Sequence, residues 1–312
     1  MSRVRTYAIA TAAILIALVL AAVGFAEEPG ALSDWQAFIL GIVQGLTELL
    51  PISSSGHLIL VPWLAEWTFL QENNAFNQTF DVALHLGTTV AVVMYFWADA
   101  SRLTVAWVGT LGTRSVKTTD ERISWFVAIA TLPALAVGGL FGSRISDNLG
   151  EPWQIAILLA VFGVVLWLAD RRPATRTFDD LTMKTGVFVG LLQCLALMPG
   201  VSRSGITISA GRFLGLNRDA AARFSFLLLI PVSVAAVIYT AVKDIGFGEL
   251  PSGWEGPFLV GTIAAFGSGL LAIQVLFRVI RRHSFTGFVV YRLIAALVIF
   301  LLIASGVRSA TF

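Results

Sequence analysis

Charged residues and cysteine are both scarce in this sequence. Only 13% of its 312 residues are Asp, Glu, Lys or Arg, whereas a soluble domain carries about 25%. Hydrophobic residues make up 57% of the chain, which predicts an integral membrane protein. The net charge of +2 is too small to indicate nucleic-acid binding. Cys194 is the only cysteine, which excludes an internal disulfide and a cysteine-based metal site.

Two polar stretches interrupt the apolar sequence. The first, QGLTELLPISSSGH, begins at Gln44, and the second, QCLALMPGVSRSGIT, begins at Gln193. Aligning these two glutamines places Ser53 on Ser202 without a gap, so the stretches read as copies of each other. Polar groups and non-helical backbone persist at membrane depth only where they are buried in protein or line a wet cavity. Both stretches are therefore candidates for a functional site.

The hydrophobic runs predict two broken segments and six full spans. A crossing needs about 20 apolar residues, and neither half of Trp35–Leu64 is that long because Pro51 and the serines break it. We therefore expect a re-entrant helical hairpin there, and a second one over Gly186–Leu197 and Ile206–Leu216. The expected spans are Val82–Trp97, Ile123–Phe141 and Ile155–Ala169 after the first hairpin, and Phe224–Ala241, Phe258–Phe277 and Val289–Ser305 after the second.

Charge along the chain assigns the two sides of the membrane, because Lys and Arg collect in short cytoplasmic loops. The residues on the expected cytoplasmic side are Arg3, Arg5, Arg102, Arg114, Lys117, Arg122, Arg171, Arg172, Arg176, Lys184, Arg278, Arg281 and Arg282. Acidic residues mark the other side: Glu27, Glu28, Asp34, Asp147, Glu151, Asp244, Glu249 and Glu255, with Arg144 and Lys243 as exceptions. The sides alternate correctly only if the first hairpin enters from outside and the second from inside.

The expected fold is an all-α polytopic membrane protein with two inverted-topology repeats. Each repeat is a re-entrant helical hairpin plus three transmembrane helices, and because three is odd, the second copy is upside down relative to the first. An extra apolar run, Tyr7–Phe25, precedes the repeats. It reads as a signal peptide or as a retained helix, and its near-spanning length favours the helix. The expected segments are 1–30 for this helix and 31–306 for one membrane domain, with repeats at about 34–170 and 184–306.

The first polar stretch offers a carboxylate, hydroxyls and an imidazole. Gln44 and Glu48 lie four residues apart, so they share a helix face. The Glu48 carboxylate needs a cation, a protonated base or a metal as partner, or else it lies in water at the helix mouth. The run from Ser53 through Ser54 and Ser55 to Gly56 follows a proline, and with the first amides of a new helix it suits phosphate oxygens. His57 can transfer a proton near neutral pH and is expected to face Glu48.

The second stretch supplies the opposite charge. Arg203 stays protonated, and its fork matches phosphate oxygens in pairs. Its hydroxyl and glycine neighbours are Gly200, Ser202, Ser204 and Thr207. One alternative stays open: Glu48 is itself the anion bound by Arg203, and the pair locks the hairpins together. Asp81, His85 and Arg223, at the starts of matching spans, are expected to support the site, whereas Arg212 and Arg218 mark the cytoplasmic interface.

These residues resemble a known family. The two stretches are similar to the signature motifs of the bacterial undecaprenyl-diphosphate phosphatases, the bacitracin-resistance type of membrane phosphatase. Gln44 and Glu48 match the motif (Glu or Gln)-x-x-x-Glu. The second motif, Pro-Gly-x-Ser-Arg-Ser-x-x-Thr, is matched at every fixed position by Pro199, Gly200, Ser202, Arg203, Ser204 and Thr207. Gln44 stands where many relatives have glutamate, which makes it a poor base and leaves fewer negative metal ligands.

The resemblance implies an enzyme of the bacterial inner membrane that hydrolyses undecaprenyl diphosphate to the monophosphate and inorganic phosphate. This step recycles the carrier lipid for peptidoglycan synthesis and confers bacitracin resistance. The resemblance also implies a divalent cation, Mg²⁺ or Ca²⁺, and a site toward the periplasm. Glu48 would bind metal or act as base, Ser54 would be a nucleophile, His57 an acid or base, and Arg203 the diphosphate clamp.

The residues leave several alternatives open. The nucleophile is Ser54, giving a phosphoenzyme, or a water activated by Glu48 or by the metal. Inverted repeats also suit a transporter or flippase for an anionic lipid or a small anion. Such a protein would use Arg203 and the serines for binding only. The expected partners are a polyprenyl diphosphate and the bilayer, without nucleic acid, and homodimerisation stays open.

Overall fold

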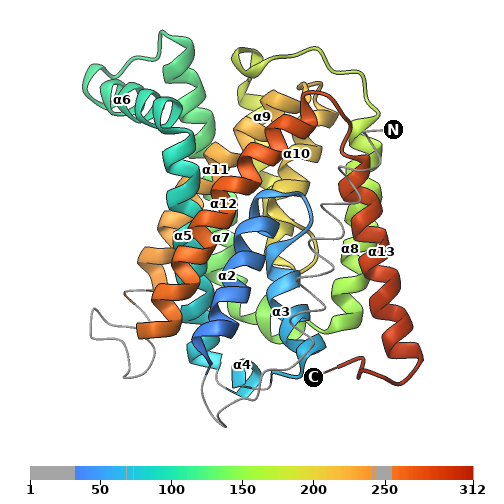
Figure 1. Ribbon diagram of the computed structural model, residues 1–312. Helices are drawn as coiled ribbons and strands as arrows, with labels where there is room; N and C mark the ends of the chain where they lie inside the picture. Colours follow the sequence, from blue (N-terminus) through green and yellow to red (C-terminus); the bar gives the residue numbers. More distant parts are fainter. Residues whose placement is uncertain (1–31, 68, 73, 241, 243–254, 312) are drawn as a thin grey trace.

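The computed structural model describes residues 32–67, 69–72, 74–240, 242 and 255–311, and within them all regular secondary structure is helical (Figure 1). The expected helix at Tyr7–Phe25 lies outside the described residues. The first helices are α2 (Asp34–Leu49), α3 (Ser54–Ala65), α4 (Phe69–Glu72), α5 (Asn74–Tyr95), α6 (Trp97–Thr113), α7 (Thr119–Asn148) and α8 (Pro152–Asp170). The rest are η1 (Phe178–Asp180), α9 (Met183–Gln193), η2 (Cys194–Leu197), α10 (Arg203–Phe213), α11 (Arg218–Thr240), α12 (Glu255–Ile280) and α13 (Thr286–Ala304), of which η1 and η2 are 3-10 turns.

Five helices are long and apolar enough to cross a membrane, namely α7, α8, α11, α12 and α13. They match five of the six spans expected from the sequence, so the chain is a multi-pass membrane protein. The sixth, Val82–Trp97, falls on α5, which meets the length and hydropathy criteria only together with α6. These two helices are bent by 87° relative to each other. Helix α6 was not expected from the sequence, because Asp99 and Arg102 interrupt its apolar pattern.

Both expected hairpins form as helix, loop and helix. Helix α2 starts with a capping box between Ser33 and Gln36, and its break precedes Pro51, which cannot donate a backbone hydrogen bond. Helix α3 begins directly after Ser53, whose hydroxyl accepts a hydrogen bond from a backbone amide in the first turn of α3. Ser202 caps α10 in the same way. In Figure 1, α9 and α10 lie toward one end of the bundle and α3 toward the other.

Close helix crossings hold the hairpins in place. Helix α2 packs on α12 at Gly45, where an added Cβ would lie 2.0 Å from Ser268 Oγ. Helix α9 packs on α7 at Gly190, where a Cβ would lie 2.6 Å from the Ala130 backbone. Small residues allow membrane helices to approach this closely. Each hairpin is thus fixed against a spanning helix of the other half of the chain.

The Arg-rich connections lie at one end of the molecule. The α6–α7 loop, the segment around η1 and the α12–α13 turn all lie at the upper end in Figure 1. Asp170 gathers several groups there: it pairs with Arg218 at 2.6 Å and Arg212 at 3.5 Å, and accepts from the Phe285 amide at 2.9 Å. Arg212 and Arg218, expected at the cytoplasmic interface, therefore bind a carboxylate that links helix ends.

Candidate active site

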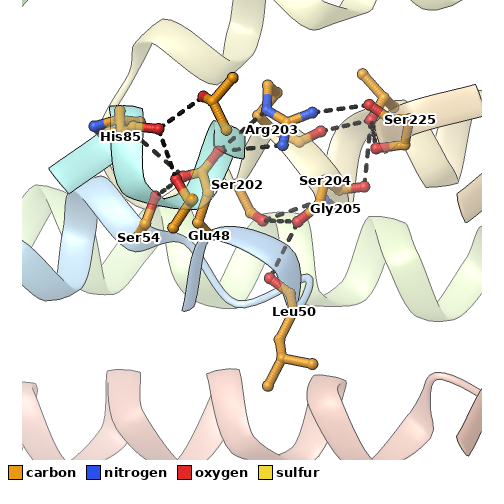
Figure 2. Close-up of polar contacts among 12 residues, drawn as sticks. Glu48, Leu50, Ser54, His85, Ser202, Arg203, Ser204, Gly205 and Ser225 are labelled. Carbon is orange, nitrogen blue, oxygen red and sulfur yellow. Dashed lines mark hydrogen bonds and ion pairs between the residues drawn. The ribbon is translucent and has the colours of Figure 1, made fainter. Parts of the chain in front are cut away.

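The loops of the two hairpins touch each other. Ser204 Oγ donates to the Leu50 carbonyl at 3.1 Å (Figure 2). The Gly200 amide donates to Ser53 Oγ at 3.0 Å. These bonds join residues that are about 150 positions apart in sequence. The two polar stretches are therefore brought together as one site, as the sequence predicts.

Glu48 is at the centre of this site and contacts three other helices. Ser54 Oγ donates to Glu48 Oε2, and His85 Nε2 lies 3.5 Å from the same oxygen. Arg203 donates to Glu48 Oε1 from Nη2 at 3.1 Å and from Nε at 3.3 Å (Figure 2). Arg203 Nη1 also donates to the Ser225 carbonyl at 2.9 Å. The Glu48–Arg203 pair left open by the sequence is therefore present, and it links the hairpins directly.

A cavity of about 260 Å³ lies beside this cluster. Its polar side is formed by Glu48, Ser54, Ser55, Asp81, His85, Gln193, Ser202 and Arg203. The rest of its lining is mostly apolar and comes from η2, α7 and α11, including Ala134, Val232 and Val237. A cavity lined by both charged and apolar groups suits an amphiphilic anion.

Five of the residues expected at the site line this cavity, namely Glu48, Ser54, Ser55, Ser202 and Arg203, and so do two of the expected supporting residues, Asp81 and His85. Others join the hairpins to their surroundings instead. Besides the Ser53 and Ser204 bonds, Thr207 Oγ1 lies 2.7 Å from Ser225 Oγ. Gly200 turns the second loop with a φ of +102°, which favours glycine. These residues shape the site without lining its cavity.

The expectation that His57 faces Glu48 is wrong. His57 is 3% exposed, with Nδ1 2.6 Å from the Ser53 carbonyl and Nε2 2.6 Å from the Tyr291 hydroxyl. Its ring therefore points from the start of α3 toward α13, away from the cavity. The histidine beside Glu48 is His85 of α5. The spacing of residues along one helix could not reveal the Glu48–His85 contact, because the two residues lie on different helices.

Arg223 also lies away from the cavity, contrary to the expectation that it supports the site. Its Nε donates to Asp99 Oδ2 at 2.8 Å, and its guanidinium lies 4.7 Å from the centre of the Phe178 ring. Asp99 belongs to the first turn of α6. Arg223 therefore fastens the helix that the sequence analysis missed.

Two glutamines carry unpaired amide atoms. Gln44 is fully buried, and neither its Oε1 nor its Nε2 has a hydrogen-bond partner in the described part of the chain. Gln193 Oε1 is likewise unpaired, and Gln193 lines the cavity. Buried polar atoms are nearly always satisfied by protein or water. The unpaired Gln193 oxygen is therefore available to water or to a ligand in the cavity.

Arg292, which was not expected at the site from the sequence, supports both loops. It is 0% exposed and donates to the carbonyls of Pro51 at 3.2 Å, Gly200 at 2.8 Å and Val201 at 3.1 Å. It also donates to Leu159 of α8 at 2.9 Å. Within the described residues, its hydrogen-bond partners are all backbone carbonyls, so its charge faces backbone dipoles. The sequence did contain a signal for this role. Arg292 falls inside the expected span Val289–Ser305, and charged residues within a membrane mark functional regions.

The donor set for a divalent cation is small. No group of three or more His, Cys, Asp or Glu side chains in the described residues is arranged to hold a metal ion. Both Glu48 oxygens already contact Ser54, His85 or Arg203. Asp81 lines the same cavity, and its carboxylate accepts no hydrogen bond within the described residues. Mg²⁺ often binds through one or two carboxylates together with substrate phosphates, and Glu48 and Asp81 are the two carboxylates that line this cavity.

Comparisons with known proteins show the family to which the chain belongs. The family model described as "Bacitracin resistance protein BacA" matches residues 37–298. The undecaprenyl-diphosphatase of Thermomicrobium roseum is 44% identical over 280 residues, covering 86% of this chain and 98% of the relative. That of Pelotomaculum thermopropionicum is 39% identical over 274 residues, covering 87% and 97%. That of Mycobacterium ulcerans is 41% identical over 284 residues, covering 90% and 100%.

Proposed function

We propose that this protein is an undecaprenyl-diphosphate phosphatase, because the chain belongs to the bacitracin resistance protein BacA family. It hydrolyses undecaprenyl diphosphate to undecaprenyl phosphate and inorganic phosphate, which recycles the carrier lipid for peptidoglycan synthesis and confers resistance to bacitracin. One observation carries the proposal: a buried Glu48, Ser54 and Arg203 cluster beside a cavity with an apolar wall. That combination suits a phosphoryl group attached to a long hydrocarbon.

The site would bind the diphosphate through charge and helix ends. Phosphoryl transfer needs positioning and charge neutralisation more than covalent chemistry from the protein. Arg203 donates to Glu48 in the structure. When the substrate binds, part of its guanidinium group would donate to the diphosphate oxygens instead. Helices α3 and α10 both begin at the cavity, with Ser54 and Arg203 as their first residues. Their free amides favour an anion between the two loops.

Ser54 is the nucleophile that the geometry favours. Its hydroxyl already donates to Glu48 Oε2, so Glu48 can take that proton as Ser54 Oγ attacks the terminal phosphorus. Undecaprenyl phosphate leaves, and water then hydrolyses the phosphoserine. His85, 3.5 Å from Glu48, takes the acid or base role expected for His57. His57 instead holds the Ser53 carbonyl and so orients the loop before Ser54.

We also propose that a divalent cation binds together with the substrate. Glu48 and Asp81 are the carboxylates that would hold it, and it would neutralise charge on the diphosphate. Mg²⁺ and Ca²⁺ both prefer such oxygen ligands. Loss of activity on chelation, with recovery on adding either ion, would support this part of the proposal.

The inverted repeat is likewise proposed, with repeats at about 34–170 and 184–306 inside one membrane domain, 31–306. Ser53 and Ser202, equivalent in the two copies, both have positive φ, at +78° and +75°, a rare conformation for serine. The equivalent Gly41 and Gly190 both meet the backbone of a spanning helix, α12 and α7 respectively. Two unusual local geometries recurring at matched positions support a duplicated unit.

We assign the site to the periplasmic half of the bacterial inner membrane. The cavity is lined by Asp81 in the first half of α5 and His85 at its middle, and by Val232 and Val237 in the second half of α11. The Arg-rich connections lie at the other end of these helices (Figure 1). Because basic loops stay in the cytoplasm, the cavity would face the outer leaflet.

Phosphate release by the purified protein tests the function. Wild-type protein reconstituted in vesicles with undecaprenyl diphosphate should release phosphate, and Arg203→Ala should lower kcat/KM at least about 100-fold because it removes a charge-paired donor. A transporter or flippase would instead move labelled lipid between leaflets without releasing phosphate. That outcome would replace the proposed reaction.

A further inference from the structure

A second cavity lies next to the catalytic one. Its volume is about 240 Å³, and it opens between α6, α7 and α11. Most of its lining is aliphatic or aromatic: Leu103, Trp107, Val127, Leu227, Ile230 and Pro231. None of its lining residues is charged. We call this cavity the α6 groove.

The two cavities share two walls. On α7, Val127 lines the α6 groove and Ala134 lines the catalytic cavity. They are seven residues apart, which is two helical turns and about 10 Å, so they lie on one face. On α11, Ile230 lines the groove, and Ser233 and Val237 on the same stripe line the catalytic cavity. The same faces of α7 and α11 therefore contribute to both cavities.

Ion pairs hold α6 over this groove. Arg223 of α11 binds Asp99 of α6, and Arg102 of α6 binds Asp120 at the start of α7. Trp125 Nε1 of α7 also donates to Thr110 Oγ1 of α6 at 3.0 Å. The helix that turns by 87° after α5 is thereby fixed to both helices that line the groove.

We propose that the α6 groove binds the isoprenoid chain of the substrate, which enters it from the catalytic cavity along the shared face of α7 and α11. The inference rests on the proposed phosphatase function. A long hydrocarbon attached to the bound diphosphate must leave the cavity along an apolar surface, and the faces of α7 and α11 that line this cavity also line a second, apolar one. The groove would then favour long-chain substrates over short ones.

Filling the groove tests this proposal. Ala128 of α7 and Ala100 of α6 both line it, so Ala128→Phe and Ala100→Phe would occupy its space from opposite walls. Ala136→Phe is the matched control, because Ala136 is exposed on α7 and lines neither cavity. Phosphate release is measured from undecaprenyl diphosphate and from farnesyl diphosphate, a short-chain analogue.

Either groove variant should lower kcat/KM for the long substrate about tenfold, while kcat/KM for farnesyl diphosphate stays near wild type. The control should leave the ratio of the two values unchanged. An unchanged ratio in both groove variants, or an equal loss on both substrates, would overturn the proposal and leave the groove to ordinary bilayer lipid. Failure of the phosphatase function itself would look different, since wild-type protein would then release phosphate from neither substrate.

Discussion

Replacing Arg292 with methionine would remove the guanidinium beneath both loops while keeping a long, flexible side chain. In the structure this group donates to three loop carbonyls, those of Pro51, Gly200 and Val201. Leaving a buried acceptor unpaired costs about 1–3 kcal/mol, so the gross loss is roughly 3–9 kcal/mol. Removing a buried charge returns several kcal/mol of desolvation energy. The loops should therefore lose about 2–4 kcal/mol of local stability.

This loss should appear mainly in turnover. A tenfold change in population corresponds to about 1.4 kcal/mol, so kcat of Arg292→Met should fall at least about 30-fold. Arg292→Lys should recover only part of it, because an ammonium lacks the planar fork that reaches several carbonyls at once. Arg281→Met is the control, since the Arg281 side chain is 68% exposed. Phosphate release by purified variants measures kcat, and near wild-type turnover by Arg292→Met would refute this reasoning.

Three further outcomes are expected. Gly45→Leu should lower the thermal unfolding temperature markedly, since its Cβ would lie 2.0 Å from Ser268 Oγ, whereas Gly267→Leu meets nothing within 4 Å and should not; equal stability of the two would contradict the packing described. Tyr291→Phe should lower kcat up to about tenfold by removing one hydrogen bond to His57; a complete loss of phosphate release would give Tyr291 a larger role. Excess EDTA should abolish phosphate release, and full activity in EDTA would exclude the cation.

Much of the fold could be predicted because polar residues are costly in a membrane. Pro51 and the serines around it identified the first hairpin, and the matching stretch from Gln193 identified the second. Helix α6 was missed for the opposite reason. Its apolar pattern is interrupted by Asp99 and Arg102, whose partners, Arg223 and Asp120, lie on other helices. Pairing between distant segments cannot be seen in a single sequence.

The site was predicted in part. Glu48, Ser54 and Arg203 came together as expected, because both loops carry motifs whose polar groups need each other. The direction of His57 could not be predicted, since it depends on Tyr291 of α13. Arg292 could have been identified in the same way as the loops, because it too is a charged residue inside an apolar run.

The central claim is that Glu48 accepts the Ser54 proton during phosphate release from undecaprenyl diphosphate. Glu48→Gln keeps the side chain's shape and removes its basicity, so it tests this claim most directly. Steady-state phosphate release by the purified variant, beside wild type, is the measurement. We predict a loss of at least about 100-fold in kcat. Turnover like that of wild type would contradict the account.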